Sequence, residues 1–162
     1  MRRNQYRLSQ LPQHLLMFVL PLLFYLAGTL LGANTPSNRL PALLPFVFLL
    51  AILFYAAFSL FGVFLSSCAM LAFGYLSGGC FIYLFQSFSF SHFLLLFPLA
   101  FLLAPCFLLL AVAANGSSLF LIRHLAMTEH DTQFRALARR LFLCLAAAGC
   151  ALFFCRILLS LA

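Results

Sequence analysis

Long apolar runs separated by short polar stretches make up most of this chain, and their lengths limit the elements that it can form. An α-helix needs about 20 apolar residues to cross the hydrocarbon core of a bilayer, which is about 30 Å thick. The first run, residues 15–33, approaches that length and follows a polar N-terminal tail, residues 1–14. No charged residue occurs from Leu43 to Ile122, and these 80 residues have room for three further crossings.

Weak polar signals divide this uncharged stretch into separate helices. Clusters of Gly, Ser, Asn and other turn-forming residues predict breaks at residues 62–67, 86–92 and 115–118. The chain is therefore predicted to be an all-α polytopic membrane helical bundle, a single integral membrane domain over residues 1–162 with about five transmembrane helices. The expected spans are approximately residues 15–33, 42–61, 68–85, 93–114 and 141–161.

One substantial polar segment, residues 123–140, precedes the last span. Thr128 and Asp131 have the spacing of a helix capping box, which predicts a helix start there. The helix then carries arginines close to the expected membrane surface, where guanidinium groups interact favourably with anionic headgroups. The residues predicted to lie at this interface are Arg135, Arg139 and Arg140.

Composition excludes a water-soluble domain. Hydrophobic residues make up 66% of the chain and charged residues 7%, against about 45–50% and about 25% in soluble proteins. The net charge of +7 does not indicate nucleic-acid binding, because the arginines flank apolar runs and form no folded basic surface. Membrane lipids are the partners that this arrangement predicts.

The placement of the nine arginines predicts the orientation of the spans. With five crossings, seven arginines fall on the same side as the N-terminus and two on the other. The positive-inside rule therefore predicts a cytoplasmic N-terminus and an external C-terminus. The lack of Lys, with abundant Leu, Phe and Arg, resembles a bacterial coding bias and favours the bacterial cell membrane. The two arginines assigned to the outside are Arg39 and Arg156.

Two pairs of glycines have the GxxxG spacing that lets helix backbones approach closely in lipid. Gly28 and Gly32 lie in the first predicted span, and Gly74 and Gly78 lie in the third. Packing within one chain is the favoured interpretation, and a subunit interface in a homo-oligomer is the alternative.

Two prolines predict bends in the fourth span. Pro98 and Pro105 are seven residues apart, or about two turns, and each removes a backbone donor. Because no polar side chain accompanies them, we interpret them as helix kinks that shape packing rather than as the lining of a transport cavity.

Candidate chemistry is sparse, so no catalytic, cofactor-binding or metal-binding residue is predicted, and the chain is not expected to be an enzyme. No acid or base lies within a span, which argues against proton-coupled transport. The six cysteines form no CxxC pair, so they are interpreted as small apolar residues. A polar cluster in the inner segment fits no metal-ligand spacing. Its members are His124, Glu129, His130 and Asp131.

An ordered series of motifs resembles the stage II sporulation protein M family of endospore-forming bacteria. It consists of an apolar helix end, a glycine-marked helix, two prolines seven residues apart and an alanine-rich helix end. The first span, the polar loop and the last span after a basic stretch also follow the family's order. The matching segments are Ser59–Gly62, Leu71–Gly79, Leu95–Pro98, Ala104–Cys106 and Ala111–Ala114.

The resemblance implies a non-catalytic membrane scaffold that localises a peptidoglycan-remodelling complex during endospore engulfment. The partners that it implies are stage II sporulation proteins D and P. The alternative is a small membrane transport component, either a permease or a substrate-binding membrane subunit, that works with a separate ATPase. A transporter requires a polar or shaped cavity near the middle of the membrane, whereas a scaffold can be solidly packed.

Overall fold

A computed structural model describes residues 2–35, 44–86, 102–126 and 132–161, and every regular element in these ranges is helical. The all-α prediction is thus confirmed for the described part of the chain. The helices are α1 (Arg2–Ala33), α2 (Leu44–Ala57), α3 (Gly62–Gln86), α5 (Ala104–Ala126) and α6 (Thr132–Leu161).

Three of the described helices are long and apolar enough to cross a membrane, as expected of a membrane-associated protein. Their apolar parts are Gly62–Tyr83, Ala104–Ile122 and Ala136–Ile157. The apolar half of α1, Met17–Ala33, and the whole of α2 are shorter. Five crossings therefore remain a prediction, which is taken up below.

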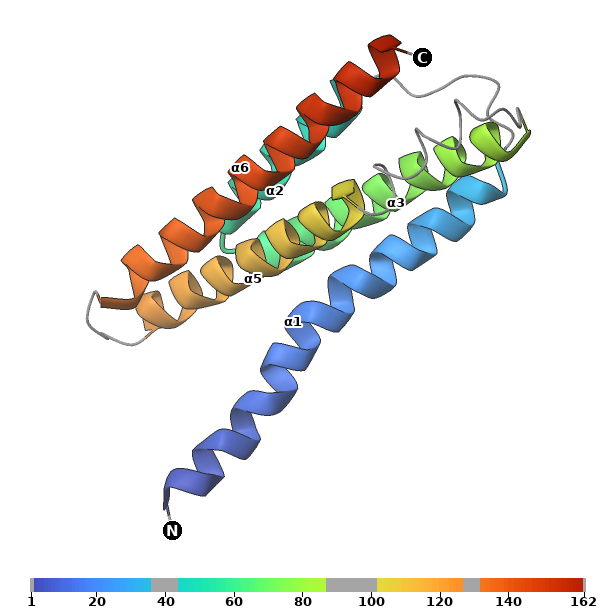
Figure 1. Ribbon diagram of the computed structural model, residues 1–162. Helices are drawn as coiled ribbons and strands as arrows, with labels where there is room; N and C mark the ends of the chain where they lie inside the picture. Colours follow the sequence, from blue (N-terminus) through green and yellow to red (C-terminus); the bar gives the residue numbers. More distant parts are fainter. Residues whose placement is uncertain (1, 36–43, 87–101, 127–131, 162) are drawn as a thin grey trace.

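Specific contacts show the directions of the helices. Gly28 of α1 lies against Leu71 of α3, and Gly32 lies against Tyr75, so α1 and α3 run parallel. Gly62 faces Ser118, while Phe73 stacks on Phe107, so α3 and α5 run antiparallel. As Figure 1 shows, α1 begins and α6 ends at opposite ends of the molecule.

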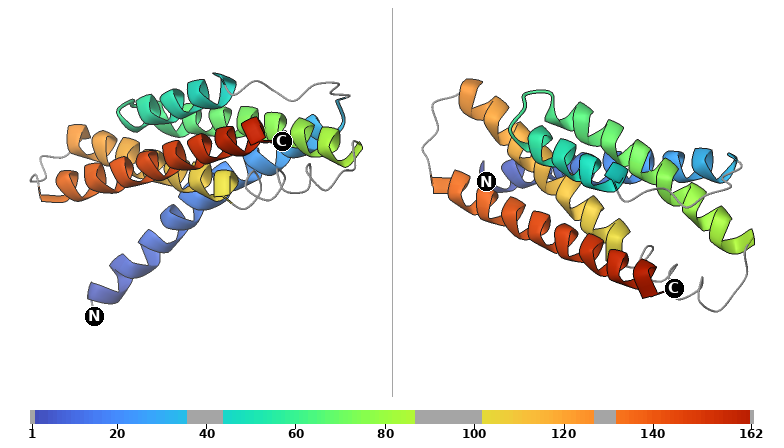
Figure 2. Two further views of the ribbon diagram at one scale, coloured as in Figure 1. Left: turned by 45° about the horizontal axis from the view of Figure 1, so that its top comes forward. Right: turned by 90° about the horizontal axis from the view of Figure 1, so that it is seen from above.

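The helices pack around the pair formed by α3 and α5. The most extensive contact is between α1 and α3, and α6 packs mainly on α5. The first half of α1 extends away from the other helices, as Figure 1 and the left view of Figure 2 show. The predicted polar tail, residues 1–14, is continuous with this helix from Arg2 onward.

Aromatic rings form the centre of the core. The Phe73 side chain is fully buried and stacks on Phe107 with ring centroids 4.4 Å apart and planes 6° apart. Tyr25 of α1 stacks against the same residue at 5.6 Å, and Phe46 of α2 meets it edge-on at 5.9 Å. These offset and edge contacts, which aromatic rings prefer, join four helices through one side chain.

The break predicted at residues 62–67 is wrong, because the chain turns earlier. A tight turn after Ala57 is closed by hydrogen bonds from Phe58 N to Tyr55 O (3.1 Å) and from Gly62 N to Ser59 O (3.1 Å). The span predicted over residues 42–61 therefore ends early, at Ala57. The two serines that were interpreted as a break lie in α3, where the Ser67 hydroxyl donates to Val63 O at 2.7 Å, as helical serines commonly do.

The helix end predicted at residues 115–118 is also wrong. α5 continues through these residues to Ala126, so the predicted span 93–114 is shifted toward the C-terminus in its described part. The predicted polar segment 123–140 is instead divided between the last turn of α5 and the first turns of α6. Its predicted capping box, Thr128 and Asp131, lies outside the described residues.

Candidate functional site

The structure brings the four GxxxG glycines together at the α1–α3 contact. Gly28 and Gly74 face each other so closely that a Cβ on Gly74 would lie 3.1 Å from the Gly28 Cα. The same Cβ would meet the Tyr25 carbonyl oxygen and lie 2.9 Å from Thr29 N. The two helices therefore touch backbone to backbone, as small residues allow in membranes.

The second glycine of each pair extends this contact by one turn. A Cβ on Gly32 would collide with the carbonyl oxygen of Tyr75, and one on Gly78 would collide with that of Thr29. In each case the obstacle is helix backbone, which cannot rotate away as a flexible side chain can. The glycine faces of α1 and α3 are thus occupied by each other within one chain.

A buried polar cluster joins α1, α3 and α5 on the N-terminal side of the glycine contact. Ser66 of α3 donates a hydrogen bond to Asn115 Oδ1 of α5, and both side chains are buried. Asn115 Nδ2 in turn donates to the backbone carbonyl of Met17 in α1 at 3.4 Å. Ser118, one helical turn beyond Asn115, donates to Ser59 O at 2.8 Å and fastens α5 to the turn between α2 and α3.

The bond to Met17 compensates for a proline that the sequence analysis did not single out. Pro21 lies fully buried within α1, and its position is four residues after Met17. Because proline has no N–H, the Met17 carbonyl lacks its usual helical donor. Asn115 supplies a replacement, and buried backbone groups in lipid must be paired in this way. The feature of the sequence that could have indicated the role of Asn115 is therefore Pro21, which lies on a different helix.

The kinks predicted at the two prolines stay predictions. Pro105 is the second residue of α5 and closely follows the π-helical residues 102 and 103. Pro98 lies outside the described residues.

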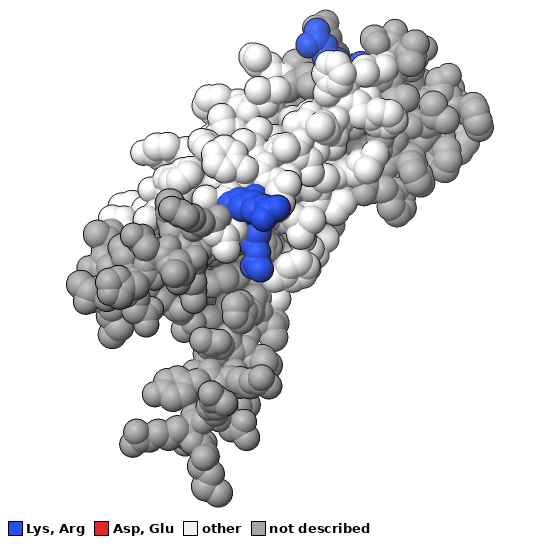
Figure 3. All heavy atoms as spheres, turned by 60° about the vertical axis from the view of Figure 1, so that its left-hand side comes forward, with Lys and Arg blue, Asp and Glu red and all other residues white. Residues whose placement is uncertain are grey.

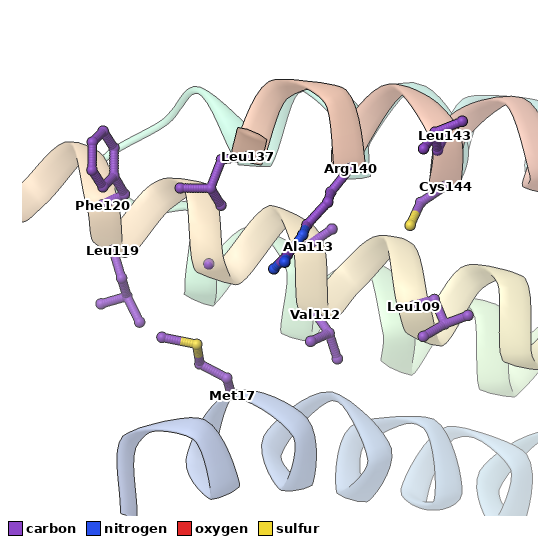
Figure 4. Close-up of a pocket in the computed structure, with 11 residues that line it drawn as sticks. Met17, Leu109, Val112, Ala113, Leu119, Phe120, Leu137, Arg140, Leu143 and Cys144 are labelled. Carbon is purple, nitrogen blue, oxygen red and sulfur yellow. The ribbon is translucent and has the colours of Figure 1, made fainter. Parts of the chain in front are cut away.

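An apolar groove of about 580 Å³ lies between α5, α6 and the apolar half of α1. Figure 4 shows Arg140 reaching from α6 toward α5 into the middle of this groove. The other lining side chains are apolar, apart from the weakly polar thiol of Cys144. The lining consists of Met17, Leu109, Val112, Ala113, Gly116, Leu119, Phe120, Leu137, Arg140, Leu143 and Cys144.

The interface arginines lie near the start of the apolar part of α6. Arg139 and Arg140 are exposed and are the fourth and fifth residues of the segment Ala136–Ile157. On the face drawn in Figure 3, positive side chains gather at two separate places among uncharged described residues. The side chain of Arg135, the third predicted interface residue, lies outside the described part.

Metal-binding side chains do not gather in the part of the chain that the structure describes. No group of three or more His, Cys, Asp or Glu residues is found there. All six cysteines are free thiols, and the polar cluster of the predicted inner segment falls largely within the undescribed residues 127–131.

Comparisons with protein-family models, with curated proteins and with solved structures give no match to this chain. The resemblance to the stage II sporulation protein M family therefore still depends on the sequence motifs alone. Of these motifs, Ser59–Gly62 forms the turn into α3 and Leu71–Gly79 lies along the contact with α1. Leu95–Pro98 lies outside the described residues.

Proposed function

We propose that this protein is a non-catalytic scaffold of the bacterial cell membrane, a bundle of five transmembrane helices that holds partner proteins in place. The observation that carries the proposal is the backbone-to-backbone contact between α1 and α3. Such a contact joins two helices without leaving room for a ligand between them, which suits a rigid support.

The helix directions support five crossings with a cytoplasmic N-terminus. Two parallel helices, α1 and α3, are separated in the chain by one helix, and α5 runs against α3. α2 has 14 residues and is about 21 Å long at 1.5 Å per residue, which is shorter than the hydrocarbon core of about 30 Å. With this alternation, seven of nine arginines fall on the cytoplasmic side.

The buried polar groups favour a scaffold over a transporter. Every buried side-chain nitrogen or oxygen in the described residues has a hydrogen-bond partner within the protein. The Ser66–Asn115 pair holds three helices together, and each of its side-chain polar atoms already has a partner within the protein. A polar substrate path would instead require unpaired polar groups facing a cavity.

Large apolar side chains on the outer faces of α2 and α6 provide surface for partner helices. Phe48 is 68% exposed on α2, and Phe153 is 67% exposed on α6. The resemblance to the sporulation family narrows this proposal to partners that degrade peptidoglycan, stage II sporulation proteins D and P, during endospore engulfment. A homo-oligomer built on the same faces would be compatible with this role.

Site-directed photo-crosslinking in membranes of the native host tests the proposal. A photoreactive phenylalanine analogue is placed at Phe48 or Phe153, with the fully buried Phe73 as the control position. We expect crosslinks to peptidoglycan-degrading proteins from the two exposed positions and none from Phe73. Crosslinks to lipid alone at both exposed positions would contradict the scaffold function.

The same experiment separates the transport alternative. A transport component would crosslink to an ATPase subunit and would raise substrate uptake when both are reconstituted in proteoliposomes. Either result would replace the scaffold proposal, whereas recovery of cell-wall enzymes without an ATPase would support it.

A further inference from the structure

Arg140 is placed unusually among the charged side chains that the structure describes. It projects into the groove between α1, α5 and α6, with apolar side chains on both sides of it (Figure 4). Arg139, the preceding residue, is also exposed but is not among the residues that line the groove. The two neighbouring arginines therefore have the same charge and nearly the same depth but different surroundings.

Among the described residues, the lining of the groove has a positive charge and no negative one. None of the eleven described lining residues is Asp or Glu. The chain contains only two acidic residues, Glu129 and Asp131, and both lie outside the described residues. The groove thus combines an apolar channel with one cation, which is complementary to an anionic amphiphile.

The position of Arg140 along α6 matches the region of lipid phosphates. It lies four residues after Ala136, where the apolar segment begins, or about 6 Å along the helix axis. An arginine at this depth can extend toward the headgroups. On the side of Arg140 toward the centre of the segment, Leu109 and Cys144 continue the groove as an apolar surface.

We propose that this groove binds an anionic phospholipid of the cytoplasmic leaflet. Its phosphate lies against the Arg140 guanidinium, which presents several N–H donors to phosphate oxygens. One acyl chain lies along Val112, Leu109 and Cys144. The volume of about 580 Å³ is within the range of ligand pockets, about 300–1,000 Å³. This site does not depend on the scaffold function, but its assignment to the cytoplasmic leaflet rests on the proposed topology.

The first test uses full-length protein in nanodiscs of phosphatidylcholine that contain a photoactivatable phosphatidylglycerol. Labelling of α5 and α6 is measured by mass spectrometry for the native protein, for Arg140→Gln and for the matched control Arg139→Gln. We expect Arg140→Gln to reduce labelling about fivefold, the effect of removing one interfacial arginine, and Arg139→Gln to change it little.

Three results would overturn the proposal. Equal losses in the two variants would show general attraction to the positive surface. Unchanged labelling in Arg140→Gln would show that its guanidinium does not hold the lipid, as expected if it pairs with Glu129 or Asp131. A photoactivatable phosphatidylcholine could also label the native protein as strongly as the phosphatidylglycerol does, with no change in Arg140→Gln. That result would show that the groove does not select for charge. Excess glycerol phosphate should not compete with the lipid, because it lacks the acyl chain.

A second variant tests the acyl chain separately from the charge. A Cβ on Gly116 would meet only Leu137 Cδ2 at 3.7 Å, an ordinary contact, so Gly116→Leu would extend into the groove. Gly149→Leu is the matched control, since its Cβ would meet nothing within 4 Å. We expect Gly116→Leu, but not Gly149→Leu, to reduce labelling. Both variants should have the same unfolding temperature as the native protein. Full labelling in folded Gly116→Leu would show that the acyl chain lies elsewhere.

Discussion

At the scale of single residues, Asn115 and Pro21 form a pair that neither helix reveals alone. The proline removes the donor that would bond to the Met17 carbonyl, and the Asn115 amide from another helix replaces it. Ser66 bonds to the carbonyl oxygen of the same amide, so the asparagine uses both of its ends. A polar residue in the middle of an apolar helix is here a structural link between helices.

Replacing Asn115 with Leu should destabilise the bundle, because it removes two interhelical hydrogen bonds and leaves the Met17 carbonyl unpaired. We expect a loss of about 1–3 kcal/mol in the free energy of unfolding, since one such bond contributes about 0.6 kcal/mol on average and about 1.7 kcal/mol at most in membrane proteins. Unfolding of the reconstituted protein by steric trapping measures it. Ser117→Ala is the control, since that hydroxyl donates to Ala113 O in its own helix.

A double-mutant cycle tests the link to Pro21 directly. In a Pro21→Ala background, residue 21 regains an N–H that can bond to Met17 O, so Asn115→Leu should cost less than in the native protein. Strictly additive free energies would show that the amide does not compensate for the proline.

At the scale of elements, the close approach of α1 and α3 depends on glycine at four positions. The sequence predicted that these glycines pack helices, from their spacing alone. It did not predict that the two pairs meet each other, or that α1 and α3 run parallel there. GxxxG spacing predicts a face of small residues on one helix. Which helix packs on that face depends on where the connecting segments place the other helices.

Gly74→Leu and Gly78→Leu should each separate α1 from α3. Because the obstacles are the backbone atoms of Tyr25 and Thr29, the helices must move apart, and we expect a loss of about 1–3 kcal/mol or more in the free energy of unfolding. A crosslink between cysteines introduced at Thr29 and Tyr75 should also weaken. The control is Gly149→Leu on α6, and equal stability of all three variants would contradict this account.

The ends of the elements were the least predictable from the sequence. Ser66 and Ser67 indicated a break because serine is common in turns, but Ser67 donates to Val63 O within α3 and Ser66 donates to Asn115 of α5. The actual turn, Phe58–Phe61, contains exposed Phe61 and Leu60 and only one polar residue. In a chain with so few polar residues, a polar side chain can mark an interhelical hydrogen bond rather than a loop.

At the scale of the whole molecule, the proposed topology places the two termini on opposite sides of the membrane. Alternating helix directions and the arginine distribution both lead to this arrangement. Reporter domains fused after Arg140 and after Ala162 should therefore report opposite sides, the first cytoplasmic and the second external. A fusion in the turn after Ala57 should be cytoplasmic as well. Signals from the same side for the first two fusions would refute five crossings.

The amino-acid sequence by itself determined the class of this protein, because 66% hydrophobic residues in runs of transmembrane length can form only helices in a bilayer. It also identified the glycines that allow close packing. Only the tertiary structure decided which faces meet, since helices that are apolar all round carry no pattern that separates core from lipid. The partner of each glycine face, the burial of Asn115 and the position of Arg140 in a groove all follow from shape and hydrogen bonding between helices distant in sequence.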